Sequence, residues 1–143
     1  MTGIIAHRGF NGLYPENTRR SFEEALKLDI VGIECDVNLT ADGQVVVIHD
    51  LTVDRTSDGS GEVAQMPFDE LRQLNIGTEE DPQQIMLLDE LLDLLEQYPG
   101  KHILIETKHP SPFGAALEEA VADVLRSRGM EADERVHLIS FNP

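Results

Sequence analysis

Short apolar runs rich in β-branched residues alternate along this chain with segments whose apolar residues recur every three or four positions. The apolar runs predict five strands, at residues 3–7, 30–37, 44–49, 102–107 and 136–140. The helical spacing predicts three longer helices. The first runs from Thr18 to about Leu28, the second has Leu88, Leu91, Leu92 and Leu95 on one apolar face and is closed by Pro99-Gly100, and the third covers 113–128. Such alternation is typical of β–α units, and it predicts an α/β fold with a parallel sheet.

The connection between the second and third predicted strands is short. Only residues 38–43 separate them, with Ala41-Asp42-Gly43 as the turn. Two strands joined in this way can form an antiparallel hairpin, whereas the surrounding β–α pattern favours parallel neighbours. The apolar pattern leaves both arrangements open.

The segment from about residue 50 to residue 86 is polar and irregular, apart from a short amphipathic stretch at 68–74. A stretch of that length without long elements is uncommon in a compact domain, and it usually has a function or forms a small subdomain. Because the chain contains neither an internal repeat nor a linker, we expect one domain over residues 1–143.

The net charge of the chain limits the classes of molecule that it is expected to bind. The 143 residues carry 11 Lys and Arg against 27 Asp and Glu, a formal net charge of −16. Nucleic acids and anionic membrane surfaces both require a basic patch, so neither is expected to bind. The sequence has no apolar run of about 20 residues for stable membrane insertion and no signal-peptide pattern at its start. The single cysteine, Cys35, excludes an internal disulfide and suits a reducing, cytoplasmic location.

Acidic side chains interrupt two of the predicted strands near their carboxyl ends. Glu34 and Asp36 are two positions apart and therefore share one face of the second strand, while Glu106 and Lys108 share a face at the end of the fourth. Three carboxylates that converge at one end of a sheet repel one another unless a cation lies between them. Oxygen ligands of this kind favour Mg²⁺ or Ca²⁺ over Zn²⁺.

Ion pairing is the structural alternative, in which Lys108, Arg8 and Arg55 neutralise the three acids. Two histidines beside the acids favour function instead, because His7 and His49 each end an apolar run and imidazole titrates near neutral pH. Arg8 offers a planar set of donors suited to a phosphate, and Gly9 allows a tight turn directly after it.

These residues occur in an order that resembles the glycerophosphodiester phosphodiesterase family. The resemblance rests on matches spread over nearly the whole chain: His7-Arg8-Gly9, Pro15-Glu16-Asn17-Thr18, Phe22 with Ala25, Glu34-x-Asp36-Val37, Thr40-x-Asp42-Gly43, Val46-Val47-x-His49-Asp50, Asp54-Arg55-Thr56 and Glu106-x-Lys108. It implies a (β/α)8 TIM barrel of the phospholipase C-like phosphodiesterase type, with the third strand adjacent to the second in the barrel and residues 50–86 as the family's insertion.

The resemblance also implies the roles of the site residues. It implies a divalent cation, Mg²⁺ or Ca²⁺, held by Glu34, Asp36 and Glu106, with His7 and His49 as the catalytic acid–base pair. Arg8 and Lys108 match residues that lie against the substrate phosphate. The implied reaction is hydrolysis of a small glycerophosphodiester to sn-glycerol 3-phosphate and an alcohol, and the assignment of acid and base between the two histidines stays open.

The length of the chain is too short for the complete barrel that the resemblance implies. A full barrel needs about 250 residues, so 143 residues supply about five of the eight strands. Three explanations are open: a fragment or truncated sequence, a homodimer in which a second copy covers the open half-barrel, or a short, catalytically inactive relative that binds a metal or a partner. A related phospholipase-type phosphodiesterase is a further alternative, although the lack of a signal peptide and of disulfides disfavours the secreted enzymes of that type.

Overall fold

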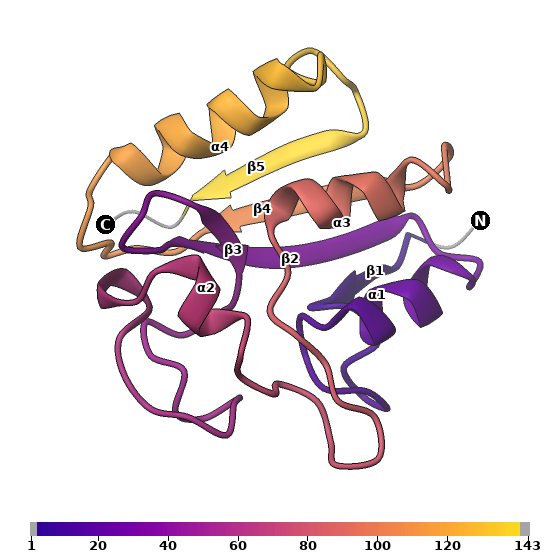
Figure 1. The fold of residues 1–143 in the computed structure, drawn as a ribbon. Coiled ribbons are helices and arrows are strands. Elements are labelled where there is room, and N and C mark those ends of the chain that lie inside the picture. The colour runs from indigo at the N-terminus through magenta and orange to yellow at the C-terminus, as the bar shows by residue number, and fades with distance from the viewer. Residues whose placement is uncertain (1–2, 141–143) are drawn as a thin grey trace.

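The computed structural model describes residues 3–140 (Figure 1). Their helices and strands follow one another in the order β1 (Ile5–His7), α1 (Arg19–Leu26), β2 (Gly32–Leu39), β3 (Val45–Val47), the 3₁₀ turn η1 (Val63–Gln65), α2 (Phe68–Leu71), α3 (Leu88–Leu95), β4 (His102–Thr107), α4 (Ala116–Ser127) and β5 (Val136–Ser140).

The sheet confirms the predicted parallel arrangement for four of its five strands. These lie in the order β1-β2-β4-β5, and each pairs in parallel with its neighbour. The register places His7 opposite Glu34 and Asp36 opposite Glu106. The carboxyl ends of β1, β2 and β4 therefore meet at one end of the sheet, where sites are built in parallel sheets and barrels.

The implied position of the third strand is wrong. β3 pairs antiparallel with β2, with Val37 opposite Val47 and Leu39 opposite Val45, so the two strands form a hairpin (Figure 1). Only five residues, 40–44, connect the paired ends, and Gly43 adopts the left-handed conformation at φ +78°. A parallel crossover needs a dozen or more residues, so this connection can only reverse the chain. β3 occupies the same edge of β2 as β1, farther along the strand.

One face of the sheet is covered by α1, α3 and α4. Alternation along β2 and β4 directs every second side chain to this face, including Ile33, Cys35 and Ile105, all of which are fully buried. The helices contribute apolar residues at helical spacing: Phe22, Ala25 and Leu26 from α1, Leu88, Leu91, Leu92 and Leu95 from α3, and Leu117, Val121 and Leu125 from α4. This layer is the main hydrophobic core.

The other face of the sheet is polar on β2 and partly open on β4. Glu34, Asp36 and Asn38 point to this side and are buried. On β4 every second residue, beginning with His102, is only half-buried. Among the described residues β5 pairs only with β4, which leaves its outer edge free. The result is a partial barrel wall whose inner face carries the acidic residues.

The predicted insertion has a core of its own. Val46 and Ile48, on the side of the β3 segment away from the main core, pack against buried residues of the insertion: Val53, Val63, Leu71, Ile76 and Ile85. This second cluster explains how a polar, irregular segment is held in place, since η1 and α2 are each too short to be stable without packing.

Two predicted helix ends differ from the observed ones. α1 begins at Arg19, where the Thr18 hydroxyl accepts a hydrogen bond from the Ser21 backbone N–H at 3.1 Å, and it ends at Leu26 rather than Leu28. α4 begins at Ala116 rather than residue 113, because Gly114 just before it has a positive φ of +57° and interrupts the helical backbone.

Candidate active site

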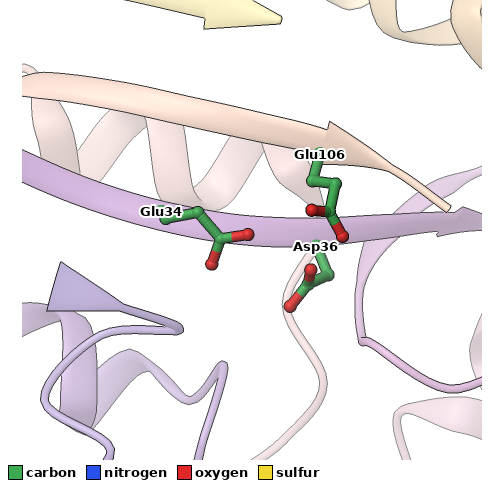
Figure 2. A group of neighbouring side chains, drawn as sticks. All are labelled: Glu34, Asp36 and Glu106. Carbon is green, nitrogen blue, oxygen red and sulfur yellow. The ribbon is translucent and has the colours of Figure 1, made fainter. Parts of the chain in front are cut away.

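Three carboxylates from β2 and β4 converge at the carboxyl end of the sheet (Figure 2). One oxygen from each of Glu34, Asp36 and Glu106 lies within 4.8 Å of the others. Alternation along β2 puts the two β2 acids on one face, and the parallel register brings Glu106 directly beside Asp36. The structure thus brings together the three predicted metal ligands.

The electrostatics of this cluster favour a cation. Burial, together with the charge of Asp36, raises the pKa of Glu34 to about 7. Burial also raises the pKa of Asp36, although a hydrogen bond from Asn17 opposes the shift. Raised values mean that the negative charges are poorly compensated by the protein itself. A positive ion between the carboxylates would relieve both the burial cost and the repulsion.

The donor set also fits a hard divalent ion. Asp36 Oδ2 accepts a hydrogen bond from Asn17 Nδ2 at 3.1 Å, whereas Oδ1 is buried without a hydrogen-bond partner among the described residues. An oxygen left in that state is costly unless something binds it. Two oxygens bound to one Mg²⁺ or Ca²⁺ lie at most roughly 4 to 5 Å apart, and the spread of the three ligand atoms matches this limit.

Arg8 lies beside the cluster on the turn that follows β1. Its Nε is 3.2 Å from Asp36 Oδ2 and its Nη1 is 2.7 Å from Glu16 Oε2. The Arg8 backbone is left-handed at φ +56°, a conformation that is uncommon outside glycine and that clusters at functional sites. Gly9 follows at φ +80°, and a Cβ there would lie 2.3 Å from Ser21 Oγ, so this turn requires glycine.

The ion-pair alternative holds for two of the three acids. Lys108 Nζ lies 2.5 Å from Glu106 Oε2, and Arg8 pairs with Asp36. Arg55 does not take part, because it binds Asp50 and Glu16 instead. Within residues 3–140, Glu34 Oε1 accepts a hydrogen bond from the Arg8 backbone N–H at 3.1 Å and lies 3.8 Å from His7 Nε2, with no arginine or lysine side chain paired to it. Arginine and lysine thus flank the cluster, while its most weakly compensated member is Glu34.

The two predicted catalytic histidines reach the cluster from different elements. His7 ends β1, with its Nε2 3.8 Å from Glu34 Oε1 and its side chain 59% exposed. His49 follows β3, and its charge opposes the rise in the pKa of Asp36 and contributes to the lowered pKa of Glu106. The hairpin explains this position, since it turns the chain back so that the Ile48 N–H donates to the Asp36 carbonyl at 3.0 Å.

Four further residues of the site were not predicted as such: Glu16, Asn17, Asp50 and Arg55. Asn17 has a positive φ of +56° while its side chain binds Asp36. In the sequence it is indistinguishable from an ordinary residue before a helix cap. Arg55, expected as a partner of the acids, instead joins Asp50 and Glu16. All four residues stand in the motifs that carry the family resemblance, so these motifs were the available signal, but the contacts among the side chains do not follow from the motifs.

Comparison with known proteins identifies the family. Residues 7–143 match the "Glycerophosphoryl diester phosphodiesterase family". The chain belongs to this family. A glycerophosphodiester phosphodiesterase from Bacillus altitudinis is 38% identical over 146 residues, covering 99% of this chain and 59% of the relative.

Solved structures of the family confirm the fold class. A glycerophosphodiester phosphodiesterase from Agrobacterium tumefaciens matches with a TM-score of 0.85 at 34% identity, covering 99% of this chain and 59% of that one. An Oleispira antarctica phosphodiesterase, in complex with the product sn-glycerol-3-phosphate, matches with a TM-score of 0.88 at 34% identity, covering 99% and 58%. The chain therefore spans little more than half the length of the family members it matches, as a partial barrel. None of the helices in residues 3–140 is long and apolar enough to cross a bilayer.

Proposed function

We propose that this chain carries the catalytic residues of a metal-dependent phosphodiester hydrolase that cleaves glycerophosphodiesters to sn-glycerol 3-phosphate and an alcohol. The observation that carries the proposal is the buried cluster of Glu34, Asp36 and Glu106, which is flanked by two histidines and two cationic side chains at one end of the sheet. Membership of the family supports the same reaction.

Glu34, Asp36 and Glu106 would hold one divalent cation, Mg²⁺ or Ca²⁺. When bound, such an ion supplies polarisation of a phosphoryl oxygen and neutralises charge there. The unpartnered Asp36 oxygen and the raised pKa of Glu34 both support these three residues as ligands.

Arg8 and Lys108 would bind the substrate phosphate. Each already lies at the edge of the cluster, held by Asp36 and by Glu106 respectively. A phosphodiester that enters this end of the sheet would meet positive charge in a protein whose net charge is −16. These two side chains therefore stabilise the negative charge that grows on the phosphoryl oxygens during the reaction.

His49 and His7 would act as base and acid. The base takes the proton from the nucleophile, either water or the neighbouring glycerol hydroxyl, as a new P–O bond forms. The acid donates a proton to the departing alkoxide as its bond to phosphorus breaks, because an alkoxide is a poor leaving group. With the glycerol hydroxyl as nucleophile, a cyclic phosphate forms first and water then opens it.

Release of sn-glycerol 3-phosphate from glycerophosphocholine tests this proposal. We expect release with Mg²⁺ or Ca²⁺, none with EDTA, and a loss of at least about 100-fold in His49→Ala and in His7→Ala. His102→Ala is the matched control, since His102 stacks on His137 at the opposite end of β4 and should keep full activity. An unchanged rate in the double His7→Ala, His49→Ala variant would contradict the acid–base assignment.

A binding module without turnover is the second candidate, because the acidic cluster could hold a cation without catalysis. This candidate predicts cation binding with no release of sn-glycerol 3-phosphate, even at high protein concentration. The release assay combined with a cation titration therefore separates the two candidates.

We also propose a cytoplasmic location and a homodimer. The free, buried Cys35 supports a reducing compartment. The free edge of β5 and the half-buried inner face of β4 support pairing with a second copy, because exposed sheet edges readily pair. Light scattering of the purified protein should give twice the 15.9 kDa mass of the chain, and a monomeric mass would contradict the dimer.

A further inference from the structure

We propose that Asp50 is a positioning residue for His49, with Arg55 holding the Asp50 carboxylate in place. Asp50 would fix the His49 ring in the form protonated at Nδ1 and so leave Nε2 to accept the proton of the nucleophile. This inference rests on the proposed acid–base role of His49. It adds Asp50, which neither contacts the cation ligands nor belongs to the predicted site, as the residue that orients His49.

The contact between the two side chains is short and specific. His49 Nδ1 lies 2.7 Å from Asp50 Oδ1. A neutral imidazole has one N–H and one lone pair, and an ionised carboxylate can only accept a hydrogen bond. The N–H must therefore be on Nδ1, and the lone pair that a general base uses is on Nε2.

Arg55 fixes the carboxylate on its other side. Its Nε donates to Asp50 Oδ2 at 2.8 Å and its Nη2 donates to Oδ1 at 3.1 Å, a two-point contact that sets the plane of the carboxylate. The Arg55 hydrogen bonds lower the pKa of Asp50 to about 2. Asp50 thus stays charged, and stays an acceptor, at any pH at which the protein is expected to work.

The backbone around His49 is held as well. Asn38, on the inner face of β2, donates from Nδ2 to the carbonyl oxygens of Ile48 at 2.9 Å and of His49 and Asp50 at 3.4 Å each. The orientation of the His49 ring is therefore restricted both by the hydrogen bonds of Asn38 to the main chain and by the hydrogen bond of the ring to Asp50.

An alternating chain of charges connects this pair to the cation cluster. Arg55 also contacts Glu16, Glu16 contacts Arg8 at 2.7 Å, and Arg8 contacts Asp36 at 3.2 Å. Burial would raise the pKa of Glu16, but its bonds to Arg55 and Arg8 outweigh this effect and lower it. A single network of ion pairs thus sets the position of His49 relative to the three carboxylates.

His7 has no comparable support from the residues that the structure describes. Its contact in the structure joins Nε2 to Glu34 over 3.8 Å, and its side chain is 59% exposed, against 28% for His49. An exposed imidazole beside a carboxylate suits an acid that delivers a proton to a leaving group. A fixed imidazole with its lone pair on Nε2 suits a base. The asymmetry assigns the base to His49.

The test combines steady-state kinetics with ¹⁵N NMR of the imidazole nitrogens in the full chain. For the unaltered protein we expect His49 in the form protonated at Nδ1. In Asp50→Asn we expect loss of that preference and a fall in kcat for glycerophosphocholine of roughly 100-fold or more, with KM changed by less than about threefold. Asp133→Asn is the matched control, because Asp133 pairs with Arg135 in the same way away from the site and has a similar pKa of about 2.

Arg55→Lys provides a second variant that keeps the charge but loses the two-point contact. It should shift the His49 nitrogen signals and lower kcat as Asp50→Asn does, but by a smaller factor. This variant keeps the test possible even if Asp50→Asn does not fold. Unchanged nitrogen signals and an unchanged kcat in either folded variant would overturn the proposal. If the unaltered protein releases no product, the proposed function fails, and the nitrogen signals still decide whether Asp50 orients His49.

Discussion

Two groups of three acidic residues in this protein have opposite surroundings. On the helical side, Asp89 and Asp93 of α3 and the adjacent Glu96 surround Arg128, whose guanidinium nitrogens lie 2.7 to 3.2 Å from their oxygens. These three carboxylates are half or more exposed, and burial of Arg128 is outweighed by its acidic partners, so that its pKa is raised. At the end of the sheet, Glu34, Asp36 and Glu106 have their cationic partners only at the edge.

The difference shows why composition alone cannot identify a cation site. Both groups contain three carboxylates, but in the first an arginine takes the central position and solvent screens the rest. In the second, burial and mutual repulsion raise the pKa values of Glu34 and Asp36, and one Asp36 oxygen has no hydrogen-bond partner among the described residues. The sheet cluster therefore has the features of a candidate cation site, whereas the group around Arg128 does not.

The largest expected effect is on cation affinity. Asp36→Asn removes the central ligand charge, and it should weaken Ca²⁺ or Mg²⁺ binding by at least about 100-fold in isothermal titration calorimetry. Asp93→Asn removes one carboxylate beside Arg128 and should leave the affinity within about twofold. Equal losses in the two variants would mean that the ion is attracted by overall charge rather than by the sheet cluster.

Cation binding should also stabilise the fold. At a free concentration of about 100 times Kd, the gain is roughly 2.7 kcal/mol, which corresponds to a rise in Tm of about 5 to 10 °C for a chain of this size. Differential scanning calorimetry with Ca²⁺ and then with EDTA measures it. The rise should disappear in Asp36→Asn and persist in Asp93→Asn, whereas a rise in both would locate the ion elsewhere.

In the metal-free protein the stability should depend on pH through Glu34. The pKa of Glu34 in the folded state is about 7, above its ordinary value of 4.5. Its stabilising contribution is therefore complete below about pH 4.5 and is lost as the pH rises through 7. In EDTA, Tm should fall between pH 5 and pH 8, and Glu34→Gln should flatten this fall. An identical slope in the variant would contradict the raised pKa.

The smallest expected effect is at the helices. Arg128→Ala removes three exposed ion pairs and should cost about 1 to 2 kcal/mol of unfolding free energy, and less at high salt. Cation affinity should not change. A urea titration at low and high salt measures the loss, and a loss that is independent of salt would show that packing rather than charge is responsible.

Much of the fold follows from local patterns. The strands at 102–107 and 136–140 were predicted at their observed bounds, because alternation acts over neighbouring residues. The apolar helix face of Leu88, Leu91, Leu92 and Leu95 is also confirmed, but α3 ends at Leu95, before the predicted stop at Pro99-Gly100. The arrangement of β3 did not follow from the apolar pattern, which left hairpin and parallel pairing open. In the structure the five-residue connection makes the two strands an antiparallel hairpin, whereas the family resemblance implied that they are adjacent strands of the barrel.

The candidate site was predicted to the extent that it depends on strand ends. Alternation placed Glu34 and Asp36 together, and the parallel register added Glu106. The supporting network of Glu16, Asp50 and Arg55 was not predicted, because it joins loops through the fold of the insertion. The family motifs include all three residues, but a motif does not show which side chains of separate loops meet.

The most direct test of the account is a crystal structure of the protein with Mn²⁺, located by its anomalous scattering. One peak is expected between the carboxylates of Glu34, Asp36 and Glu106, and none beside Asp89, Asp93 and Glu96. A peak at the helices, or a sheet cluster that binds no ion at saturating Mn²⁺, would contradict it.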